Sequence, residues 1–243
     1  MNHHMTVHPP APSHALLQAS VTAYGLRVRG GWRPTASDSL PSLPGGCSAA
    51  VVWMIGVVGS EFWPAFKAST FYSDGLPDPL DRWSRSIGTE LAQKWGGRAL
   101  FPFDGPPYYP FQQWATRTEP LQTSPLMMRI HPEFGVWHAY RFAMALPTVS
   151  PNEVLAIGHS LRAVNGDLCT TCVGQPCLSA CPVQAFTGTG YLLDTCSEQL
   201  HKAAGVDCMT AGCLSRRACP VGREYTYETE HAAFHMRAFT ERY

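Results

Sequence analysis

The chain has 243 residues, enough for one large domain or two small ones, and hydrophobic residues make up 45% of it. Its 18 Lys and Arg residues balance its 18 Asp and Glu residues, so it lacks the excess positive charge that attracts nucleic acid. The longest apolar run, Ala49–Val58, is too short to cross a membrane and the N-terminus lacks a signal-peptide pattern, so we expect a cytoplasmic protein with no nucleic-acid or membrane partner.

The first segment, residues 1–13, is rich in His and Pro and predicts a disordered tail. His14–Tyr24 then shows the apolar spacing of a helix, and Gly25 suits the end of a helix. The side chains expected on the packed side of this helix are Leu16, Leu17 and Val21. A short strand is expected at Leu26–Val28.

A stretch rich in Ser, Pro and Gly, Pro34–Gly46, predicts a surface loop. The compact β-branched run Ala49–Val58 follows it and predicts a strand that is buried on both faces. Cys47 stands alone at the entrance of this strand, and we interpret it as a small hydrophobic residue.

The clearest helical pattern lies at Pro79–Trp95. Asp78 is the candidate N-cap, and Pro79 suits the first turn because its missing N–H would have no partner there. The apolar stripe of this helix repeats every fourth residue and comprises Trp83, Ile87, Leu91 and Trp95.

Three further elements are expected in the rest of the chain. Gly105–Gln113, "GPPYYPFQQ", predicts an irregular aromatic loop that either lines a pocket or caps the core. Val136–Leu146 alternates in the manner of a strand. Glu230–Phe239 predicts a helix whose packing side is formed by Ala233, Met236 and Phe239.

Eight of the nine cysteines fall into two related runs near the C-terminus. The first run, C-x2-C-x4-C-x3-C-P, contains Cys169, Cys172, Cys177 and Cys181, and the second contains Cys196, Cys208, Cys213 and Cys219, again followed by proline. Thiolate-only sets are typical of iron–sulfur clusters or zinc. Two-cluster ferredoxins use the closely similar C-x2-C-x2-C-x3-C-P, which favours clusters. Zinc, which prefers paired C-x2–4-C knuckles, and disulfides remain as alternatives.

The cysteine segment resembles the bacterial-type ferredoxin domain, and its stretched second run is similar to that of epoxyqueuosine reductases and reductive dehalogenases. The resemblance implies that the fourth cysteine of each run binds the cluster of the other run. One [4Fe-4S] cluster is then assigned to Cys169, Cys172, Cys177 and Cys219, and the second to Cys181, Cys196, Cys208 and Cys213. Both of those enzyme families reduce their substrates with a cobalamin that two such clusters supply with electrons.

An earlier stretch, "IHPEFGVWHAYRFAMALP" at residues 130–147, resembles the signature of the animal cobalamin-processing decyanase/dealkylase family. The matching residues are His131, Pro132, Phe134, Gly135, Trp137, Arg141, Leu146 and Pro147. The similarity covers roughly residues 15–147 and includes "LLQASVTAYGLRVRGGW", "DPLDRW" and "YYPFQQ". The animal family lacks the cysteine runs, and its arginine-rich glutathione-binding surface has no counterpart here, so glutathione-dependent dealkylation is not implied.

Together the two resemblances imply an α+β fold: a nitroreductase-like antiparallel sheet with flanking helices, and a small ferredoxin-like iron–sulfur domain. The expected segments are a disordered tail at 1–13, a cobalamin-processing-like domain at 14–160, a ferredoxin-like domain at 161–225 and a C-terminal helix at 226–243. The residues that the resemblance assigns to cobalamin are Tyr108, Tyr109, Gln113, His131, Gly135, Trp137 and Arg141.

Each of these residues also has a purely structural interpretation. His131 is held extended by the following proline, and it either bonds a corrin amide or supports the strand start. Trp137 offers a flat face to a corrin or fills the core. Arg141 lies in mid-strand among apolar residues and needs an anionic partner, which is either a ligand or a buried carboxylate.

Three functions are compatible with the sequence. The first is an oxidoreductase that binds and reduces cobalamin, or uses it to reduce a substrate, with electrons from two [4Fe-4S] clusters. The second is a ferredoxin-like carrier that binds no cobalamin. The third is tRNA modification of the epoxyqueuosine reductase kind, which the neutral charge disfavours. Each requires an external electron donor such as a flavodoxin, a ferredoxin or a reductase.

Overall fold

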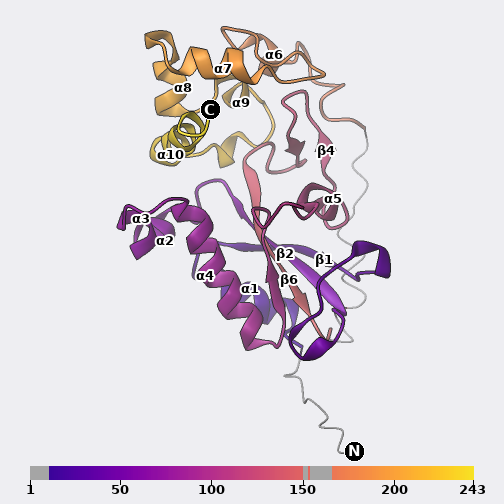
Figure 1. Cartoon of the computed structure of the whole chain (residues 1–243). Coiled ribbons are helices and arrows are strands. Elements are labelled where there is room, and N and C mark those ends of the chain that lie inside the picture. The colour runs from indigo at the N-terminus through magenta and orange to yellow at the C-terminus, as the bar shows by residue number, and fades with distance from the viewer. Residues whose placement is uncertain (1–10, 150–152, 154–165) are drawn as a thin grey trace, which may run out of the picture. The chain divides into compact units, whose positions relative to one another are not determined.

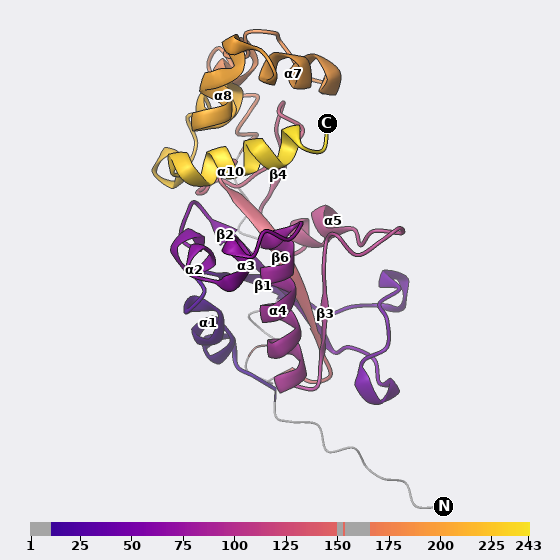
Figure 2. The same ribbon diagram turned by 60° about the vertical axis from the view of Figure 1, so that its left-hand side comes forward.

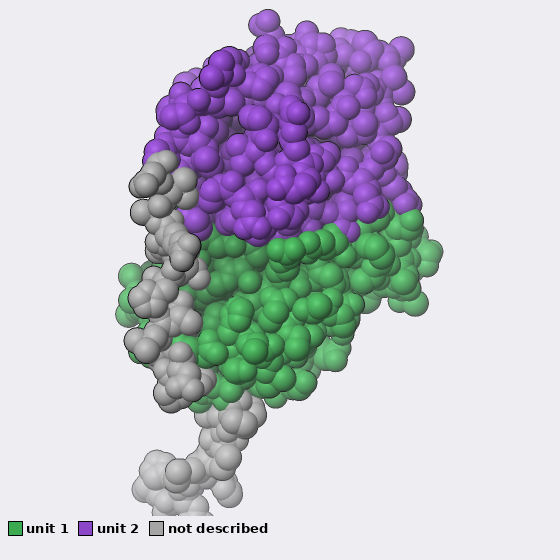
Figure 3. Space-filling view, turned by 180° about the vertical axis from the view of Figure 1, so that it is seen from behind, with its two compact units in different colours: residues 1–57, 61–119, 139–162 green, residues 58–60, 120–138, 163–243 purple. Residues whose placement is uncertain are grey.

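The computed structural model describes residues 11–149, 153 and 166–243. These residues form two compact units, which Figure 3 distinguishes by colour. As far as they are described, unit 1 comprises residues 1–57, 61–119 and 139–162, and unit 2 comprises residues 58–60, 120–138 and 163–243. The segment 120–138, expected in the N-terminal domain, therefore belongs to unit 2. The expected boundary at residue 160 and most of the expected tail lie outside the described residues.

Unit 1 is built on a four-stranded sheet with the order β1-β2-β6-β3 (Figure 1). The strands are β1 Arg27–Trp32, β2 Val51–Val58, β3 Arg98–Leu100 and β6 His138–Leu146; the last residue of β2 and the first of β6 count with unit 2. β1 pairs antiparallel with β2, and β3 with β6. Ala50 donates to the Leu146 carbonyl at 2.8 Å while Gly56 lies against Ala139, so β2 and β6 are antiparallel too.

The helices of unit 1 are mostly short. They are α1 His14–Thr22, α2 Trp63–Lys67, α3 Thr70–Ser73, α4 Pro79–Lys94 and α5 Phe111–Thr116, with 3-10 turns η1 Ala36–Asp38 and η2 Pro44–Gly46 in the predicted surface loop. The Ser13 hydroxyl caps α1 by accepting the Leu16 N–H at 3.2 Å. The predicted helices at α1 and α4 and the strands at β1, β2 and β6 are thus confirmed, with small differences in their ends.

The core of unit 1 follows the apolar pattern of the sequence. All eight residues of β2 are buried, as a strand covered on both faces requires. The predicted stripe of α4 is also buried, and its Trp83 packs against Phe62 and Phe66 with ring centroids 5.9 and 5.5 Å apart. This aromatic cluster fixes α4 next to the α2 segment.

Several details of the sequence prediction are wrong in unit 1. Leu16 is 50% exposed, so only Leu17 and Val21 pack from α1. Asp78 does occupy the predicted N-cap position of α4, but its backbone is left-handed (φ +51°) and its side chain makes no capping hydrogen bond. The aromatic loop ends earlier than expected, because Phe111 already begins α5.

Unit 2 contains one small strand pair and mainly short helices (Figure 2). Its elements are β4 Gln122–Thr123, β5 Arg129–Ile130, α6 Pro176–Ser179, α7 Leu193–Leu200, η5 Ala203–Gly205, α8 Val206–Ala211, α9 Leu214–Arg217, η6 Arg223–Tyr225 and α10 Thr229–Thr240. α10 packs against α8, and α6 packs against α9. In the described part of the chain, no helix has both the length and the apolarity needed to cross a membrane.

The C-terminal helix is confirmed as α10, but its packing side was predicted incorrectly. His231 and Ala232 are the buried residues, whereas Ala233, Met236 and Phe239 are half-buried. Apolar spacing alone points to the wrong face because the buried polar side chain of His231 takes part in the contact.

A buried ion pair in unit 1 connects strands β1, β2 and β6 with the loop that follows α5. Arg29 on β1 makes a bidentate pair with Glu119, with N–O distances of 2.7 and 2.8 Å, and donates to the Val57 carbonyl at 3.1 Å. The Tyr140 hydroxyl on β6 also donates to Glu119. Burial, and then the Glu119 charge and hydrogen bond, raise the pKa of Tyr140 and outweigh the opposing Arg29 charge, so the phenol keeps its donor proton.

We predict that Glu119→Ala lowers the free energy of unfolding by about 3–5 kcal/mol, because it leaves the Arg29 guanidinium buried without its counter-charge. Urea denaturation of the purified variant measures this loss. The matched control is Glu61→Ala, which breaks the half-exposed pair with Arg27 and changes stability by less than about 1 kcal/mol. Equal losses in the free energy of unfolding would show that the buried pair contributes no more stability than the half-exposed pair.

Candidate functional site

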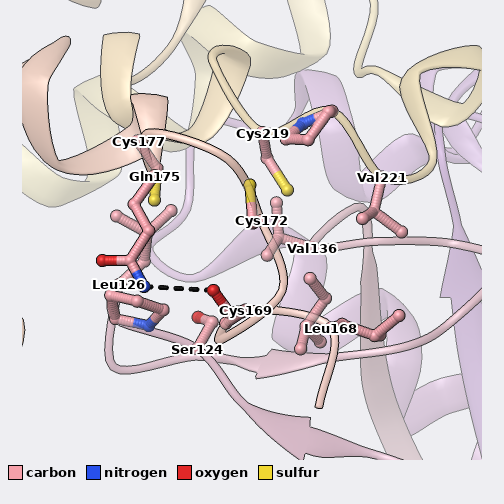
Figure 4. Close-up of a pocket in the computed structure, with 13 residues that line it drawn as sticks. Ser124, Leu126, Val136, Leu168, Cys169, Cys172, Gln175, Cys177, Cys219 and Val221 are labelled. Carbon is pink, nitrogen blue, oxygen red and sulfur yellow. Dashed lines mark hydrogen bonds between the residues drawn. The ribbon is translucent and has the colours of Figure 1, made fainter. Parts of the chain in front are cut away.

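Unit 2 contains a pocket whose lining includes four of the cysteines (Figure 4). These are Cys169, Cys172, Cys177 and Cys219, and the pocket encloses about 360 Å³ of space when its open mouth is counted. The side chains of Cys172 and Cys219 converge although 47 positions separate them in the chain. The other walls are mainly apolar and include Leu126, Ile130, Val136, Leu168 and Val221. This is the set that the ferredoxin resemblance assigns to one cluster.

Hydrogen bonds to the backbone shape the loop that carries the first of these cysteines. Asp167 accepts the N–H groups of Cys169 at 2.9 Å and Thr170 at 3.2 Å. Gln175 donates from its side chain to the Cys169 carbonyl at 3.0 Å, the dashed line in Figure 4. Gln122 on β4 accepts the Leu168 N–H at 2.7 Å, which fastens the loop to the strand pair. Polar side chains therefore fix the conformation of the loop at the pocket, and one of them, Gln175, also lines the pocket.

Two of the thiols in this pocket, those of Cys169 and Cys177, have raised pKa values. Burial first, then the Asp167 charge and the three neighbouring thiols, raise the pKa of Cys169 to about 11. Burial and the neighbouring Cys219 and Cys172 also raise the pKa of Cys177. Four thiolates can coexist here only if a positive charge offsets their repulsion and lost hydration. The chemistry of the pocket therefore suits a cationic group.

The other four cysteines form a second set. Burial raises the pKa of Cys196, a hydrogen bond from Tyr191 opposes the rise, and the nearby thiols of Cys181 and Cys208 add to it. Burial also raises the pKa of Cys213, which lies near Cys208 and Cys196. Each set thus draws three cysteines from one run and one from the other.

Two single-turn helices carry a cysteine of each set. Cys177 lies in α6, and Cys181 follows the end of that helix. Cys213 is the N-cap residue of α9, and Cys219 follows its C-cap. Because α6 packs against α9, the two sets share one rigid support.

All nine cysteines are described, and all have free thiols. Within the described residues, no three His, Cys, Asp or Glu side chains converge closely enough to hold a single metal ion. Cys47 lies in unit 1, apart from the other eight, and is half-buried with its sulfur 3.8 Å from the Pro44 carbonyl oxygen.

The residues expected to bind cobalamin fall into both units. Unit 1 contains Tyr108, Tyr109, Gln113 and Arg141, and unit 2 contains His131, Gly135 and Trp137. Tyr108 is 60% exposed and Gln113 is exposed, so both are accessible. Tyr109 is half-buried, with its ring 5.5 Å from that of Trp114.

Arg141 has a carboxylate partner, one of the two possibilities that the sequence left open, and this carboxylate is half-buried. Its guanidinium donates to Asp81 at 2.5 Å and to the Ser84 hydroxyl at 3.0 Å, and both partners lie on α4. The side chain is 12% exposed. Arg141 therefore joins the sheet to α4.

His131, Gly135 and Trp137 likewise have structural roles in unit 2. The Nδ1 atom of His131 accepts the N–H groups of Glu133 and Phe134, at 3.1 and 3.2 Å, so its proton lies on Nε2. Gly135 has a φ of +57°, and a Cβ there would lie 2.0 Å from the Val221 carbonyl oxygen. Trp137 is 3% exposed and belongs to the core cluster that contains Cys219.

Sequence reasoning missed three groups of side chains in unit 2. Arg216 lies over the rings of Trp137 and Tyr227, at 4.6 and 4.3 Å, and donates twice to the Val136 carbonyl. Tyr191 neighbours the second cysteine set. His231 and His235 bond each other on α10. Only the histidine pair had a visible signal, the spacing of four residues within a helix.

No protein-family model matches the sequence, and no curated protein sequence matches it significantly. A solved structure with a similar fold is the B12-trafficking protein CblC of C. elegans, described as a homologue of human MMACHC. The two share 13% sequence identity with a TM-score of 0.53, over 93% of this chain and 91% of that chain. The likeness establishes a CblC-like mixed fold of helices and antiparallel sheet.

The extent of this likeness bears on the expected ferredoxin-like domain. Coverage of 93% leaves only about 17 of the 243 residues outside the overlay, so most of the cysteine-containing segment is included. A separate ferredoxin domain appended to a CblC-like domain is therefore not shown. The cysteine sets lie within a unit that also contains residues 120–138.

We predict that Gly135→Ala lowers the free energy of unfolding of unit 2 by at least about 2 kcal/mol, because the new Cβ collides with the Val221 carbonyl and the backbone is left-handed. Thermal and urea unfolding report the loss. Gly174→Ala is the matched control: its φ is +72° but nothing lies within 4 Å, so only the backbone term of about 1 kcal/mol applies. A Gly135→Ala protein as stable as this control would contradict the close approach.

Proposed function

We propose that this chain is an iron–sulfur redox protein that binds and reduces cobalamin, or uses it to reduce a substrate. Two [4Fe-4S] clusters are held by the two cysteine sets, and an external carrier such as a flavodoxin, a ferredoxin or a reductase supplies electrons. The observation that carries the proposal is the gathering of eight thiols into two sets of four within one unit.

The residues present fit such clusters. Thiolate is the donor that iron–sulfur clusters require, and each set offers four. Ser215 lies on α9 between Cys213 and Cys219; its hydroxyl is buried and has no hydrogen-bond partner among the described residues. The sulfide sulfurs of a bound cluster would accept a hydrogen bond from this buried hydroxyl and so supply the partner that it needs. When bound, the clusters supply one-electron transfer.

The arrangement favours clusters over zinc. A tetrahedral zinc ion needs its ligands about 2.3 Å from one point. No three candidate ligands among the described residues converge in that way. Thiolates around a cluster each bind a different iron, so they surround a larger group. The arrangement in the described residues is therefore compatible with the iron–sulfur proposal, which the two cysteine runs carry.

Support for cobalamin comes from the fold and from one stretch of sequence. The chain has a CblC-like fold, and the printed description of that C. elegans protein names B12 trafficking. The sequence at 130–147 resembles the cobalamin-processing signature. Among the residues assigned to cobalamin by that resemblance, the exposed Tyr108 is the best placed to meet a ligand from solvent.

A ferredoxin-like carrier that binds no cobalamin is the second candidate. One observation favours it: His131, Trp137 and Arg141 are all engaged in contacts within their own units. If these structural contacts account for the residues that resemble the cobalamin-processing signature, only the cysteine sets remain as the functional part of the chain.

We predict that the anaerobically purified protein contains about eight irons and eight sulfides per chain. Cys172→Ser and Cys208→Ser each remove one ligand from a different set and should leave about four irons. Cys47→Ser is the matched control and should keep about eight, since Cys47 lies in the other unit. Iron and sulfide analysis gives these counts. Stoichiometric zinc without sulfide would contradict the cluster assignment.

We predict that hydroxocobalamin bound to the protein changes its spectrum, and that it is reduced when the reduced clusters are present. Tyr108→Ala should weaken binding about tenfold or more with unchanged iron content, and spectral titration measures it. Leu76→Ala removes an equally exposed apolar side chain from the same unit and should bind normally. If the titration of an iron-loaded protein shows no spectral change with any cobalamin form, the cobalamin proposal is wrong and the ferredoxin-like carrier is the remaining candidate.

A further inference from the structure

We propose that His231 and His235 form a binding site for a divalent transition-metal ion, separate from the cysteine sets. Both histidines lie on α10, four residues apart, so their side chains share one face of the helix. Their Nε2 atoms are 3.0 Å apart. Two nitrogens that face each other at this distance can share one proton or, in its place, one metal ion.

The separation of the two nitrogens matches the requirement of a metal ion. Metal–nitrogen bonds of about 2.0–2.1 Å place two adjacent ligand nitrogens about 2.9–3.4 Å apart, for octahedral to tetrahedral angles. The observed 3.0 Å lies within that range. An ion bound by both nitrogens would lie beside the line that joins them, so both rings must turn toward it.

The other ring nitrogen of His231 is held as metal-binding histidines require. Its Nδ1 lies 2.9 Å from the Ser60 hydroxyl oxygen, which also accepts the Glu228 N–H at 2.9 Å. A hydroxyl oxygen accepts two hydrogen bonds, so Nδ1–H can donate to it. This tautomer leaves the lone pair on Nε2, and outer contacts of this kind orient the ring.

Packing also fixes the His231 ring before any ion binds. The residue is fully buried, and its ring stacks on Tyr227 with centroids 3.9 Å apart. The guanidinium of Arg216 lies over the same Tyr227 ring at 4.3 Å. This nearby positive charge weakens the attraction for a cation, so we expect moderate affinity despite the preorganised ring.

The donor set determines which ions the site takes. Imidazole nitrogens suit Zn²⁺, Ni²⁺, Cu²⁺ and Co²⁺ and bind Mg²⁺ or Ca²⁺ poorly. The pair supplies two ligands, so water or an added ligand completes the coordination. Protons compete for the same lone pairs, and binding should therefore fall as the pH drops through the ordinary histidine range near 6.5.

The test is calorimetric titration of the full-length protein with Zn²⁺ at pH 7.5, with iron content measured in parallel. His235→Gln keeps an amide of similar reach but removes the ligand. We expect the wild type to bind one more equivalent of Zn²⁺ than this variant, or to bind it at least about tenfold more tightly, and to lose it at pH 5.5. A Co²⁺ difference spectrum between the two proteins should lack thiolate charge-transfer absorption.

His201→Gln is the matched control, because His201 is another histidine of unit 2; it is exposed, and its Nδ1 lies against the Ser197 carbonyl. It should bind Zn²⁺ like the wild type. All three proteins share the same cysteines and the same N-terminal histidines, so any difference belongs to the pair on α10. Equal stoichiometry and affinity in wild type and His235→Gln would overturn the proposal, whatever the iron content.

Discussion

The burial of neighbouring thiols is the physical constraint on which unit 2 depends. A buried thiolate loses hydration, and every further thiolate nearby makes its ionisation harder. The raised pKa values of Cys169, Cys177, Cys196 and Cys213 reflect both effects. A positively charged group between the thiols removes the repulsion and replaces the lost hydration. The stability of unit 2 is therefore coupled to what its cysteines bind.

The candidate site belongs to the core of unit 2. Cys219 is 7% exposed and packs in one apolar cluster with Ile130, Val136 and Trp137. Arg216 connects the same cluster to α9 by donating to the Val136 carbonyl. The residues that resemble a cobalamin-processing signature and the residues that resemble a ferredoxin thus meet in one packed structure. This explains why the CblC-like overlay runs through the cysteine segment.

Local patterns predicted the parts of the fold that depend on local physics. The β-branched run of β2 and the fourth-residue stripe of α4 are buried as expected, since each reflects the period of its own element. The packing face of α10 was predicted incorrectly, because it depends on distant partners, whereas Asp78 takes its predicted N-cap position with a left-handed backbone and no capping hydrogen bond. The ferredoxin resemblance of the cysteine runs indicated which thiols gather. Arg216 and Ser60 gave no such signal, because their contacts join segments far apart in sequence.

The shared support of α6 and α9 has a consequence for how the cysteine sets fill. Each of these helices contains or adjoins one cysteine from the first set and one from the second, and the two helices pack together. If both sets hold clusters, as proposed, a cluster in one set would immobilise both helices and so order one ligand pair of the other set in advance. The second cluster would then bind with a smaller loss of conformational entropy, so half-filled chains would be rarer than with independent sites.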